Sequence, residues 1–291
     1  MSFRAGTVAL IGRPNAGKSS LLNALVGEKI AAVSKRPQTT RVRMIGVYAT
    51  DTMQAVLVDT PGIHAAWNPL NTAMVHAATS ALAEVDVVCW IIDALGWKED
   101  PELRAMLADS KKLVIALNKI DAIEKPALLP IMTALQDLGA PIVPISAKSK
   151  LGLDALTGEW ASRLPEQEPL YPPDHVTDTL EREICSELIR ERIFELAEQE
   201  VPYATAVEVE KFDESERDKG RVHIHARIIV EKPSQKAILI GKGGSMIKKI
   251  GTDARKQIET LLGCHVRLDL FVVVEKDWTR KPRMLKGLGL A

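Results

Sequence analysis

Eight consecutive residues near the start of the chain have the composition of a loop that binds nucleotide phosphates. Residues 12–19 (GRPNAGKS) fit the pattern G-x-x-x-x-G-K-[ST]. The glycines allow successive backbone N–H groups to turn toward phosphate oxygens, and a helix that starts there adds the partial positive charge of its N-terminus. Lys18 would reach the β- and γ-phosphates, and the Ser19 hydroxyl would bind Mg²⁺. The residues expected to hold the phosphates are Gly12, Asn15, Ala16, Gly17, Lys18, Ser19 and Ser20.

Three later motifs follow in the order that a guanine-nucleotide site requires. In residues 59–62 (DTPG), Asp59 would hold Mg²⁺ through water and the Gly62 N–H would touch the γ-phosphate. In residues 118–121 (NKID), the Asp121 carboxylate can accept hydrogen bonds from the guanine N1–H and exocyclic amine. Adenine lacks this pair of donors, so the motif favours GTP over ATP. The residues expected around the base are Asn118, Lys119, Asp121, Ser146, Ala147 and Lys148, of which the last three would supply a backbone N–H to the guanine oxygen.

Residues 34–41, between the phosphate loop and the next strand, are polar and lack periodicity. A threonine here that binds Mg²⁺ beside the γ-phosphate would order the segment in the GTP state, and the pattern does not choose between Thr39 and Thr40. The predicted metal ligands are therefore Ser19, Thr39, Thr40 and Asp59, and the predicted catalytic residues are Lys18, Thr39, Thr40 and Gly62.

The hydrolytic machinery is expected to be slow. Many related GTPases have Gln directly after the Asp-x-x-Gly motif to orient the attacking water, and this chain has Ile63 there. Arg13, Arg36 and Arg41 are near the motifs, but none is an evident arginine finger. Asn15 could help to bind a K⁺ ion that supplies the missing charge.

A second glycine cluster predicts contact with RNA. Gly241 and Gly244 have the G-x-x-G spacing of a KH domain, in which the loop between two short helices clamps the backbone of about four nucleotides. Missing side chains let phosphate approach, and lysines supply charge. Ile238, Ile240, Ile247 and Ile250 would line a base-holding groove or form the core beneath it, the core being favoured for each. The predicted RNA contacts are Ile240, Gly241, Lys242, Gly243, Gly244, Ser245, Met246, Lys248 and Lys249.

The elements that position these residues divide the chain in two. The first half alternates buried strands with helical patterns such as 70–83 and 127–138, which predicts an α/β fold with a doubly wound, mostly parallel sheet. Residues 43–50 should form a hairpin with the next strand and add one antiparallel strand. The predicted strands are 7–11, 53–58, 85–92, 113–117 and 142–145.

A proline-rich stretch around residues 164–173 predicts a semi-rigid linker. Beyond it the expected order is a helix over 176–199, strands over 204–209 and 222–230, two short helices around the glycine cluster, and a strand over 266–274. This predicts a smaller α+β domain. The predicted domains are 1–165 (GTPase), 166–175 (linker) and 176–291 (RNA-binding, with a basic tail).

Charge is unevenly distributed along a chain of zero net charge. Residues 1–165 carry 17 Lys/Arg against 15 Asp/Glu, residues 166–230 carry 8 against 17, and residues 231–291 carry 13 against 6. The last block is compatible with a polyanion contact or a solvated basic face. The most apolar stretch is interrupted by Asp86 and Asp93, so no membrane span is expected, and no secretion signal is evident. Three widely separated cysteines predict reduced thiols.

Two smaller features favour ordinary roles. His223 and His225 alternate on a predicted strand and share one face, but no third metal ligand is evident, so they are expected to be surface residues. Residues 278–283 (WTRKPR) could stack and pair with RNA or could form a docked tail.

Taken together, these motifs resemble the Era family of bacterial ribosome-assembly GTPases over nearly the whole chain. The resemblance rests on residues 12–19, 36–41, 59–64, 118–121, 146–148 and 241–244, and an apolar residue at position 63 is itself similar to the family. It implies a P-loop GTPase domain followed by a type II KH domain, with GTP or GDP and Mg²⁺ as cofactors. It also implies binding to the 3′ end of 16S rRNA, a role in assembly of the 30S subunit, a monomer, and a cytoplasmic location with peripheral association with the inner membrane.

Two alternatives stay open at the level of sequence. One is a GTPase of tRNA modification or membrane remodelling, which the G-x-x-G loop and the lack of a C-terminal catalytic cysteine motif disfavour. The other is an RNA-binding module with a structural nucleotide site, which the complete phosphate and guanine motifs disfavour.

Overall fold

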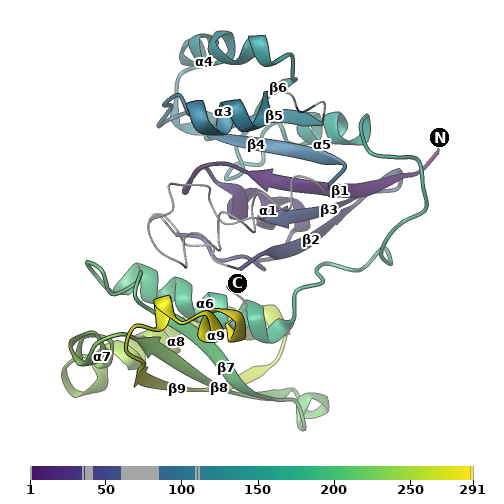
Figure 1. Ribbon diagram of the computed structural model, residues 1–291. Helices are drawn as coiled ribbons and strands as arrows, with labels where there is room; N and C mark the ends of the chain where they lie inside the picture. Colours follow the sequence, from purple (N-terminus) through teal and green to yellow (C-terminus); the bar gives the residue numbers. More distant parts are fainter. Residues whose placement is uncertain are drawn as a thin grey trace. The chain divides into compact units, whose positions relative to one another are not determined.

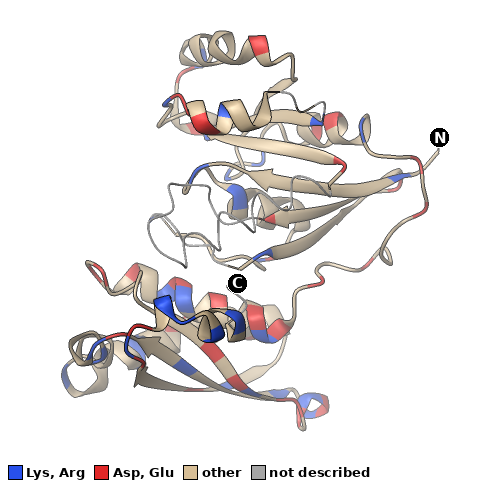
Figure 2. Ribbon diagram, viewed as in Figure 1, with Lys and Arg blue, Asp and Glu red and all other residues tan. Residues whose placement is uncertain are grey.

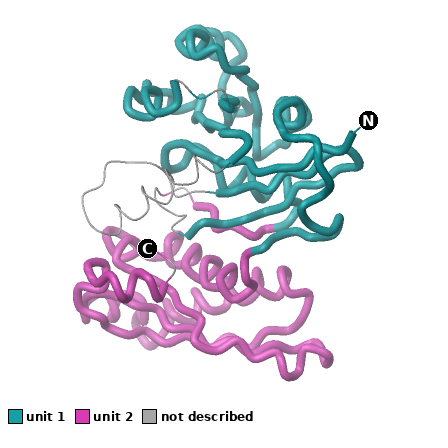
Figure 3. Tube along the Cα trace, turned by 45° about the vertical axis from the view of Figure 1, so that its right-hand side comes forward, with its two compact units in different colours: residues 1–28, 41–65, 74–178 teal, residues 29–40, 66–73, 179–291 magenta. Residues whose placement is uncertain are grey.

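A computed structural model describes residues 2–34, 36, 42–59, 85–108, 110, 112–288 and 290 (Figure 1). The chain groups into two compact units (Figure 3). The first comprises the residues up to Glu28 and, among the described residues that follow, 42–59 and those from Val85 to Asp178. The second contains the segment that begins at Lys29 together with everything from Thr179 onward. The domain limits expected from the sequence stay predictions, since this grouping follows contacts and assigns the proline-rich stretch to the first unit.

The described part of the first unit contains a sheet of six strands in the order β2-β3-β1-β4-β5-β6. All neighbouring strands are parallel except β2 and β3, which form the expected antiparallel hairpin. The strands are β1 (Arg4–Ile11), β2 (Met44–Ala49), β3 (Met53–Asp59), β4 (Val87–Asp93), β5 (Leu113–Asn118) and β6 (Ile142–Pro144). The doubly wound, mostly parallel sheet predicted from the sequence is confirmed.

The strands of this sheet are continuously apolar, so both of its faces need to be covered. On one face, Leu103 and Leu107 pack with Ile131, Leu135 and alternate residues of the central strands. On the other face, the Cys89 thiol lies beside the indole of Trp160. The helices among the described residues of this unit are α1 (Lys18–Val26), α3 (Pro101–Leu107), α4 (Leu128–Leu135) and α5 (Leu153–Ala161). The helix predicted over 127–138 is α-helical only from Leu128 to Leu135, and a 3₁₀ turn lies at each end of it.

The proline-rich stretch is held along the first unit by hydrogen bonds. The buried Gln54 side chain accepts from the N–H groups of Leu170 and Tyr171 and donates to the Tyr171 carbonyl. Further along, the Val47 N–H donates to the carbonyl of Val176. The helix predicted from residue 176 starts at Glu181, because Val176 and Thr177 are already hydrogen-bonded to Val47 and Ile45 of β2.

The second unit has the order predicted from the sequence, α-β-β-α-α-β. Its described strands form a sheet in the order β7-β8-β9, with β7 antiparallel and β9 parallel to the central β8. β7 is longer than predicted and contains a bulge between Val209 and Lys211. The elements are α6 (Glu181–Leu196), β7 (Ala206–Asp213), β8 (Arg221–Val230), α7 (Pro233–Ile240), α8 (Ser245–Leu262), β9 (His265–Val274) and α9 (Pro282–Gly287).

The C-terminal tail is docked on this unit. Trp278 is fully buried, and its indole N–H donates to the Ala204 carbonyl at 3.0 Å. Leu285 of α9 is also buried. Of the two roles left open for residues 278–283, the docked tail is correct for the Trp278 ring, which is not accessible for stacking on a base. Among the described residues, no helix is both long and apolar enough to cross a membrane.

Candidate nucleotide and RNA sites

The phosphate loop lies at the carboxyl edge of the parallel strands, between the end of β1 and the start of α1. Two of its glycines are required by close approach of the backbone. A Cβ on Gly12 (φ 153°) would lie 2.3 Å from the Ile91 carbonyl oxygen, and a Cβ on Gly17 (φ 99°) would lie 2.1 Å from Nδ2 of Asn118. Asn15 has a left-handed φ of 64°, which asparagine tolerates better than most residues. The loop is therefore a backbone cradle in which side chains at these glycines do not fit.

Lys18 is buried beneath this loop. Its Nζ donates to the carbonyl oxygens of Gly12 at 2.9 Å and Arg13 at 3.0 Å. Burial lowers the pKa of Lys18 to about 8, against the opposing attraction of the Asp59 carboxylate. A cation with so few water contacts interacts strongly with an incoming phosphate, because the surrounding dielectric is low.

The metal end of the site is defined by Ser19 and Asp59. The Ser19 hydroxyl donates to Oδ2 of Asp59 at 2.6 Å, and Asp59 is fully buried at the end of β3. A hydroxyl and a carboxylate are the oxygen donors that Mg²⁺ prefers. The donor set therefore fits the expected ion. Thr39, Thr40 and Gly62, the other residues predicted for metal binding or catalysis, lie outside the described residues, as do Ile63 and Arg41.

Asn118 connects the phosphate loop to the guanine motifs. Its Nδ2 donates to the Ala16 carbonyl at 2.9 Å, and its Oδ1 accepts from the N–H groups of Lys119 (2.8 Å) and Ala147 (3.0 Å). The side chain is almost fully buried. Three motifs far apart in sequence are thus fixed to one another by a single amide.

Asp121, the carboxylate expected to select guanine, is positioned by a hydrogen bond from Ser146. Oδ1 of Asp121 accepts from the Ser146 hydroxyl at 2.6 Å, and Ser146 Oγ in turn accepts from the Ser149 N–H. Lys119 adopts a left-handed φ of 68° and donates from Nζ to Oδ2 of Asp93 at 2.6 Å. Ala147 is held by Asn118, Ser20 follows Ser19 in α1, and Lys148 is exposed next to Ala147 in the chain. The structure brings together the described residues predicted for phosphate and base.

Sequence reasoning missed Asp93 and Asp100 as supporting residues. Asp93 ends β4 at the edge where β3 and β5 also end, so its place in the strand order could have identified it. Asp100 caps α3 and pairs with Nε of Arg13 at 2.5 Å. Arg36 donates to the Ala197 carbonyl. Two of the three arginines near the motifs are therefore engaged elsewhere, consistent with the lack of an evident arginine finger.

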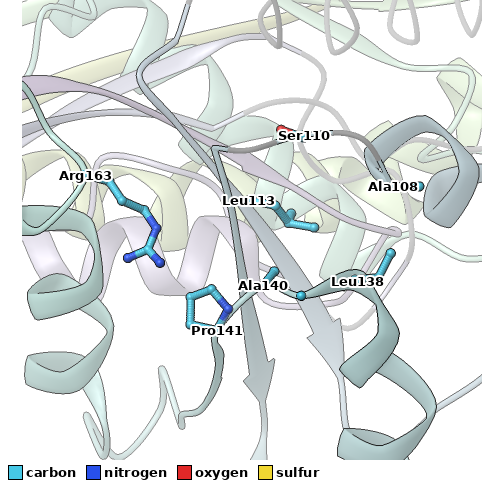
Figure 4. A pocket seen from close by; sticks show the side chains of 8 residues that line it. Ala108, Ser110, Leu113, Leu138, Ala140, Pro141 and Arg163 are labelled. Carbon is cyan, nitrogen blue, oxygen red and sulfur yellow. The ribbon is translucent and has the colours of Figure 1, made fainter.

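The cavity shown in Figure 4 lies at the opposite edge of the sheet. It is about 240 Å³ in volume and is lined by Leu113 and Pro141, at the amino ends of β5 and β6, and by Arg163. The Arg163 guanidinium is already paired with Glu159 at 2.7 Å. Because doubly wound sheets bind ligands outside the carboxyl ends of their strands, this cavity is not the nucleotide site.

The second glycine cluster joins α7 to α8. Gly241 has a φ of 72°, and a Cβ there would lie 2.7 Å from Cβ of Met246, so the loop closes only with glycine. Gly243 and Gly244 also have positive φ but face open space. Lys242, Ser245, Lys248 and Lys249 are exposed, and Ile240 and Met246 are half-buried. Basic residues gather along this part of the second unit (Figure 2). All nine predicted RNA contacts thus lie on or beside one loop, and their role stays a prediction.

A groove of about 320 Å³ lies beside this loop. It is lined from α8 by Ile247, Lys248, Gly251, Thr252 and Arg255 and from β9 by Leu268, Asp269 and Leu270. Of the four isoleucines predicted to line a groove or form the core, Ile247 lines the groove and Ile250 is fully buried in the core. Ile240 is half-buried and Ile238 is exposed. Thr252 and Arg255 were missed, although spacing of four and seven residues from Lys248 places them on the same helix face.

Sequence reasoning also missed Glu191, on α6. It is almost fully buried, accepts from Nζ of Lys29 at 2.6 Å, and accepts from the Val33 N–H at 3.0 Å. It also pairs with Arg192. The segment after α1 therefore belongs to the same compact unit as α6, and this unit contains residues of the predicted GTP-dependent switch (Figure 3).

Comparisons with known proteins agree with this geometry. The family described as "50S ribosome-binding GTPase" matches residues 7–119, and the KH domain family matches residues 200–279. GTPase Era of Geobacter metallireducens is 47% identical over 292 residues, covering 99% of this chain and 98% of the relative.

Two solved structures are similar over nearly the full chain. One is a variant of Aquifex aeolicus Era bound to GDP and AlF₄⁻, with a TM-score of 0.92, 36% identity, and coverage of 99% of this chain and 100% of that one. The other is Era in complex with MgGDPNP and nucleotides 1506–1542 of 16S ribosomal RNA, with a TM-score of 0.92, 36% identity and 99% coverage of both chains. This identity over almost the whole length, with a complete nucleotide site and a KH loop, shows that the chain belongs to the Era family of GTPases.

Proposed function

We propose that this chain is a GTP-hydrolysing switch that binds the 3′ end of 16S rRNA and acts in assembly of the 30S ribosomal subunit. The observation that carries the proposal is the presence in one chain of a guanine-nucleotide site and a glycine loop beside an open basic groove. The similar Era crystallised with MgGDPNP and nucleotides 1506–1542 of 16S rRNA supports the choice of RNA.

The proposed roles in hydrolysis follow from the described residues. Lys18 neutralises charge on the β- and γ-phosphates, while Ser19 and Asp59 hold Mg²⁺, which supplies a Lewis acid for the phosphate oxygens. Asn118 fixes the phosphate loop against the base site, and Asp121 accepts from guanine. Ile63 cannot hydrogen-bond an attacking water, so we expect slow intrinsic turnover. A K⁺ ion near Asn15 would raise it, and equal turnover in potassium and sodium buffers would refute that part.

Coupling between nucleotide and RNA is proposed to pass through the segment after α1. This segment continues from the helix that starts at the phosphate loop, and Glu191 of α6 holds it at both Lys29 and Val33. GTP and Mg²⁺ would order residues 34–41, which immediately follow. Coupling requires that the nucleotide have different affinities for two arrangements of this segment.

The test is RNA binding in two nucleotide states. The full chain is titrated with a short RNA matching the 16S rRNA 3′ end, with a nonhydrolysable GTP analogue and with GDP, against a scrambled RNA. Tighter, sequence-dependent binding in the GTP state is expected. Equal binding in both states would remove the coupling, and no preference over the scrambled RNA would remove the assigned target.

Three further properties are proposed on the family resemblance: the chain is a monomer, it is located in the cytoplasm, and it associates peripherally with the inner membrane. Sedimentation at several concentrations tests the first. Co-sedimentation with vesicles of anionic lipid, in each nucleotide state, tests the last, and absence of binding to vesicles in both states would refute it.

A further inference from the structure

The open face of the KH sheet brings two histidines and a carboxylate to one point. His223 and His225 are two residues apart on β8, so both point to the same face. In the parallel register, His225 lies opposite Asp269 of β9. Asp269 is the third ligand that was not evident from the sequence, because only the strand pairing places it there.

The ligating atoms are close enough to share one ion. Nε2 of His223 is 2.7 Å and Nε2 of His225 is 3.9 Å from Oδ2 of Asp269. One nitrogen or oxygen from each residue lies within 4.8 Å of the others, and this is the one such group of metal-binding type within the described ranges. In a tetrahedral zinc site with bonds near 2.0–2.1 Å, ligand atoms are separated by about 3.3 Å. Small rotations of side chains would bring both distances to this value.

The surroundings favour a preformed site. The three side chains are each about one-third exposed, at 28%, 31% and 30%. The Phe271 ring lies nearly parallel to that of His225, with centroids 6.4 Å apart, and the rings of His223 and His225 have centroids 4.2 Å apart. Because β8 and β9 pair along ten residues each, the backbone positions are fixed before any ion arrives, which lowers the entropic cost of binding.

The cationic side chains near these three residues do not prevent an ion from binding. Arg267 Nε lies 3.4 Å from Asp269 Oδ2, but its side chain is 74% exposed and can move into solvent. Lys211, opposite His225 on β7, is paired with Asp213 at 2.8 Å. A hydrogen bond between His223 and Asp269 would account for two of these residues but not for His225. A bound ion would use all three side chains.

We propose that His223, His225 and Asp269 form a binding site for one divalent transition-metal ion, with Zn²⁺ as the expected occupant. Two neutral imidazoles and a carboxylate are the donors that zinc accepts, leaving one position for water or another oxygen ligand. The ion joins β8 to β9. Because Asp269 lines the groove beside the glycine loop together with Leu268 and Leu270, the site shares this residue with the wall of the groove.

The test is metal binding by the full chain after dialysis against a chelator, with GDP and excess Mg²⁺ present to occupy the nucleotide site. Zn²⁺ is titrated directly, and Co²⁺ is used as a visible-absorption probe of coordination. Wild type should bind one equivalent, with a tetrahedral Co²⁺ spectrum. His223→Gln, His225→Gln and Asp269→Asn should each weaken binding at least about tenfold.

Matched controls come from the start of β9, the strand that contains Asp269. His265 is 92% exposed, and Cys264 precedes it, so these two residues are the obvious adventitious site. His265→Gln and Cys264→Ser should leave affinity unchanged. The proposal is overturned if wild type binds no stoichiometric ion, if the control variants lose as much affinity as the ligand variants, or if the ligand variants bind as well as wild type. Thermal unfolding of each variant without metal shows that it is folded.

Discussion

At the scale of single residues, buried polar side chains determine the nucleotide site more than exposed ones do. Asn118, Lys18 and Asp59 are almost fully buried. Asn118 and Asp59 are each hydrogen-bonded to a separate motif, and Lys18 is hydrogen-bonded to the backbone of its own phosphate loop. A buried polar group that loses its partner costs about 1–3 kcal/mol. Asn118 and Asp59 therefore support both stability and nucleotide affinity, and the two effects can be separated by experiment.

Asn118→Ala should destabilise the protein even without nucleotide. The change removes three hydrogen bonds and leaves the Ala16 carbonyl and two N–H groups unpaired, so the free energy of unfolding should fall by about 2–4 kcal/mol. Urea unfolding of the nucleotide-free protein measures it. Asp121→Asn is the control, because Asp121 is exposed and an amide keeps the bond with Ser146. Its stability should stay within about 0.5 kcal/mol of wild type while GDP affinity falls. Equal stability of Asn118→Ala and wild type would contradict the connecting role.

Nucleotide affinity should depend on pH through Lys18. Burial lowers the pKa of Lys18 to about 8 in the free protein, and bound phosphates would raise it again. Binding therefore takes up protons, and affinity is greatest where Lys18 is already protonated, below pH 8. Between pH 7 and pH 9 the Kd for GDP should increase about tenfold. Calorimetry in buffers of different ionisation enthalpy would detect the proton uptake, and a Kd that is flat over this range would count against a lowered pKa.

The same lowered pKa affects stability with the opposite trend. Lys18 is less easily protonated in the folded state than in the unfolded chain, so its burial opposes folding most strongly below pH 8. This penalty declines as pH rises from about 8 toward the ordinary lysine value of 10.5 and is absent above it.

At the scale of elements, the close packing of strand ends against the phosphate loop decides which glycines matter. Gly17 starts α1 and Gly27 follows its last turn, and both have positive φ. Only the first is surrounded by other atoms, because Asn118 at the end of β5 lies directly against it. Similar dihedral angles therefore have different consequences at the two ends of one helix.

Gly17→Ala and Gly27→Ala make a matched pair. Both place a Cβ on a left-handed backbone and should lose about 1–2 kcal/mol of stability. Only Gly17→Ala would displace Asn118, so only this variant should also lose GDP affinity, by at least about tenfold, or about 1.4 kcal/mol. Isothermal titration with GDP distinguishes them. A similar loss of affinity in Gly27→Ala would show that helix strain alone, and not the clash with Asn118, disturbs the site.

At the scale of the whole molecule, one buried carboxylate is the structural basis proposed for communication. Glu191 contacts Lys29 and Val33, which follow the helix of the phosphate loop, and lies on the first helix of the RNA-binding unit. A segment with contacts in one unit and sequence continuity with the other can couple nucleotide to RNA only if the nucleotide has different affinities for two arrangements of the segment.

Glu191→Gln should reduce coupling without abolishing either activity. The amide oxygen can still accept from the Val33 N–H, but the charge that attracts Lys29 is lost. The ratio of RNA affinities in the GTP-analogue and GDP states should move toward one, while GDP affinity stays near that of wild type. Glu195→Gln on the exposed side of α6, where Glu195 pairs with Arg192, is the control and should keep the wild-type ratio. An unchanged ratio in Glu191→Gln would exclude this route.

The sequence by itself determined the parts of this protein that depend on local pattern. Residues 12–19, 118–121 and 241–244 predicted their loops correctly, because glycine tolerance, helix starts and strand ends are set by neighbouring residues. The alternation of buried strands and helices predicted the first sheet and its antiparallel edge for the same reason.

Only the tertiary structure decided what depends on pairing between distant segments. It showed that Trp278 is buried, that residues 176–180 are not helical, and that Glu191 holds the segment after α1. Above all, Asp269 lies 44 residues beyond His225 and meets it only through the parallel register of β8 and β9. Such contacts are set by strand register and long-range packing, which neither spacing nor composition encodes.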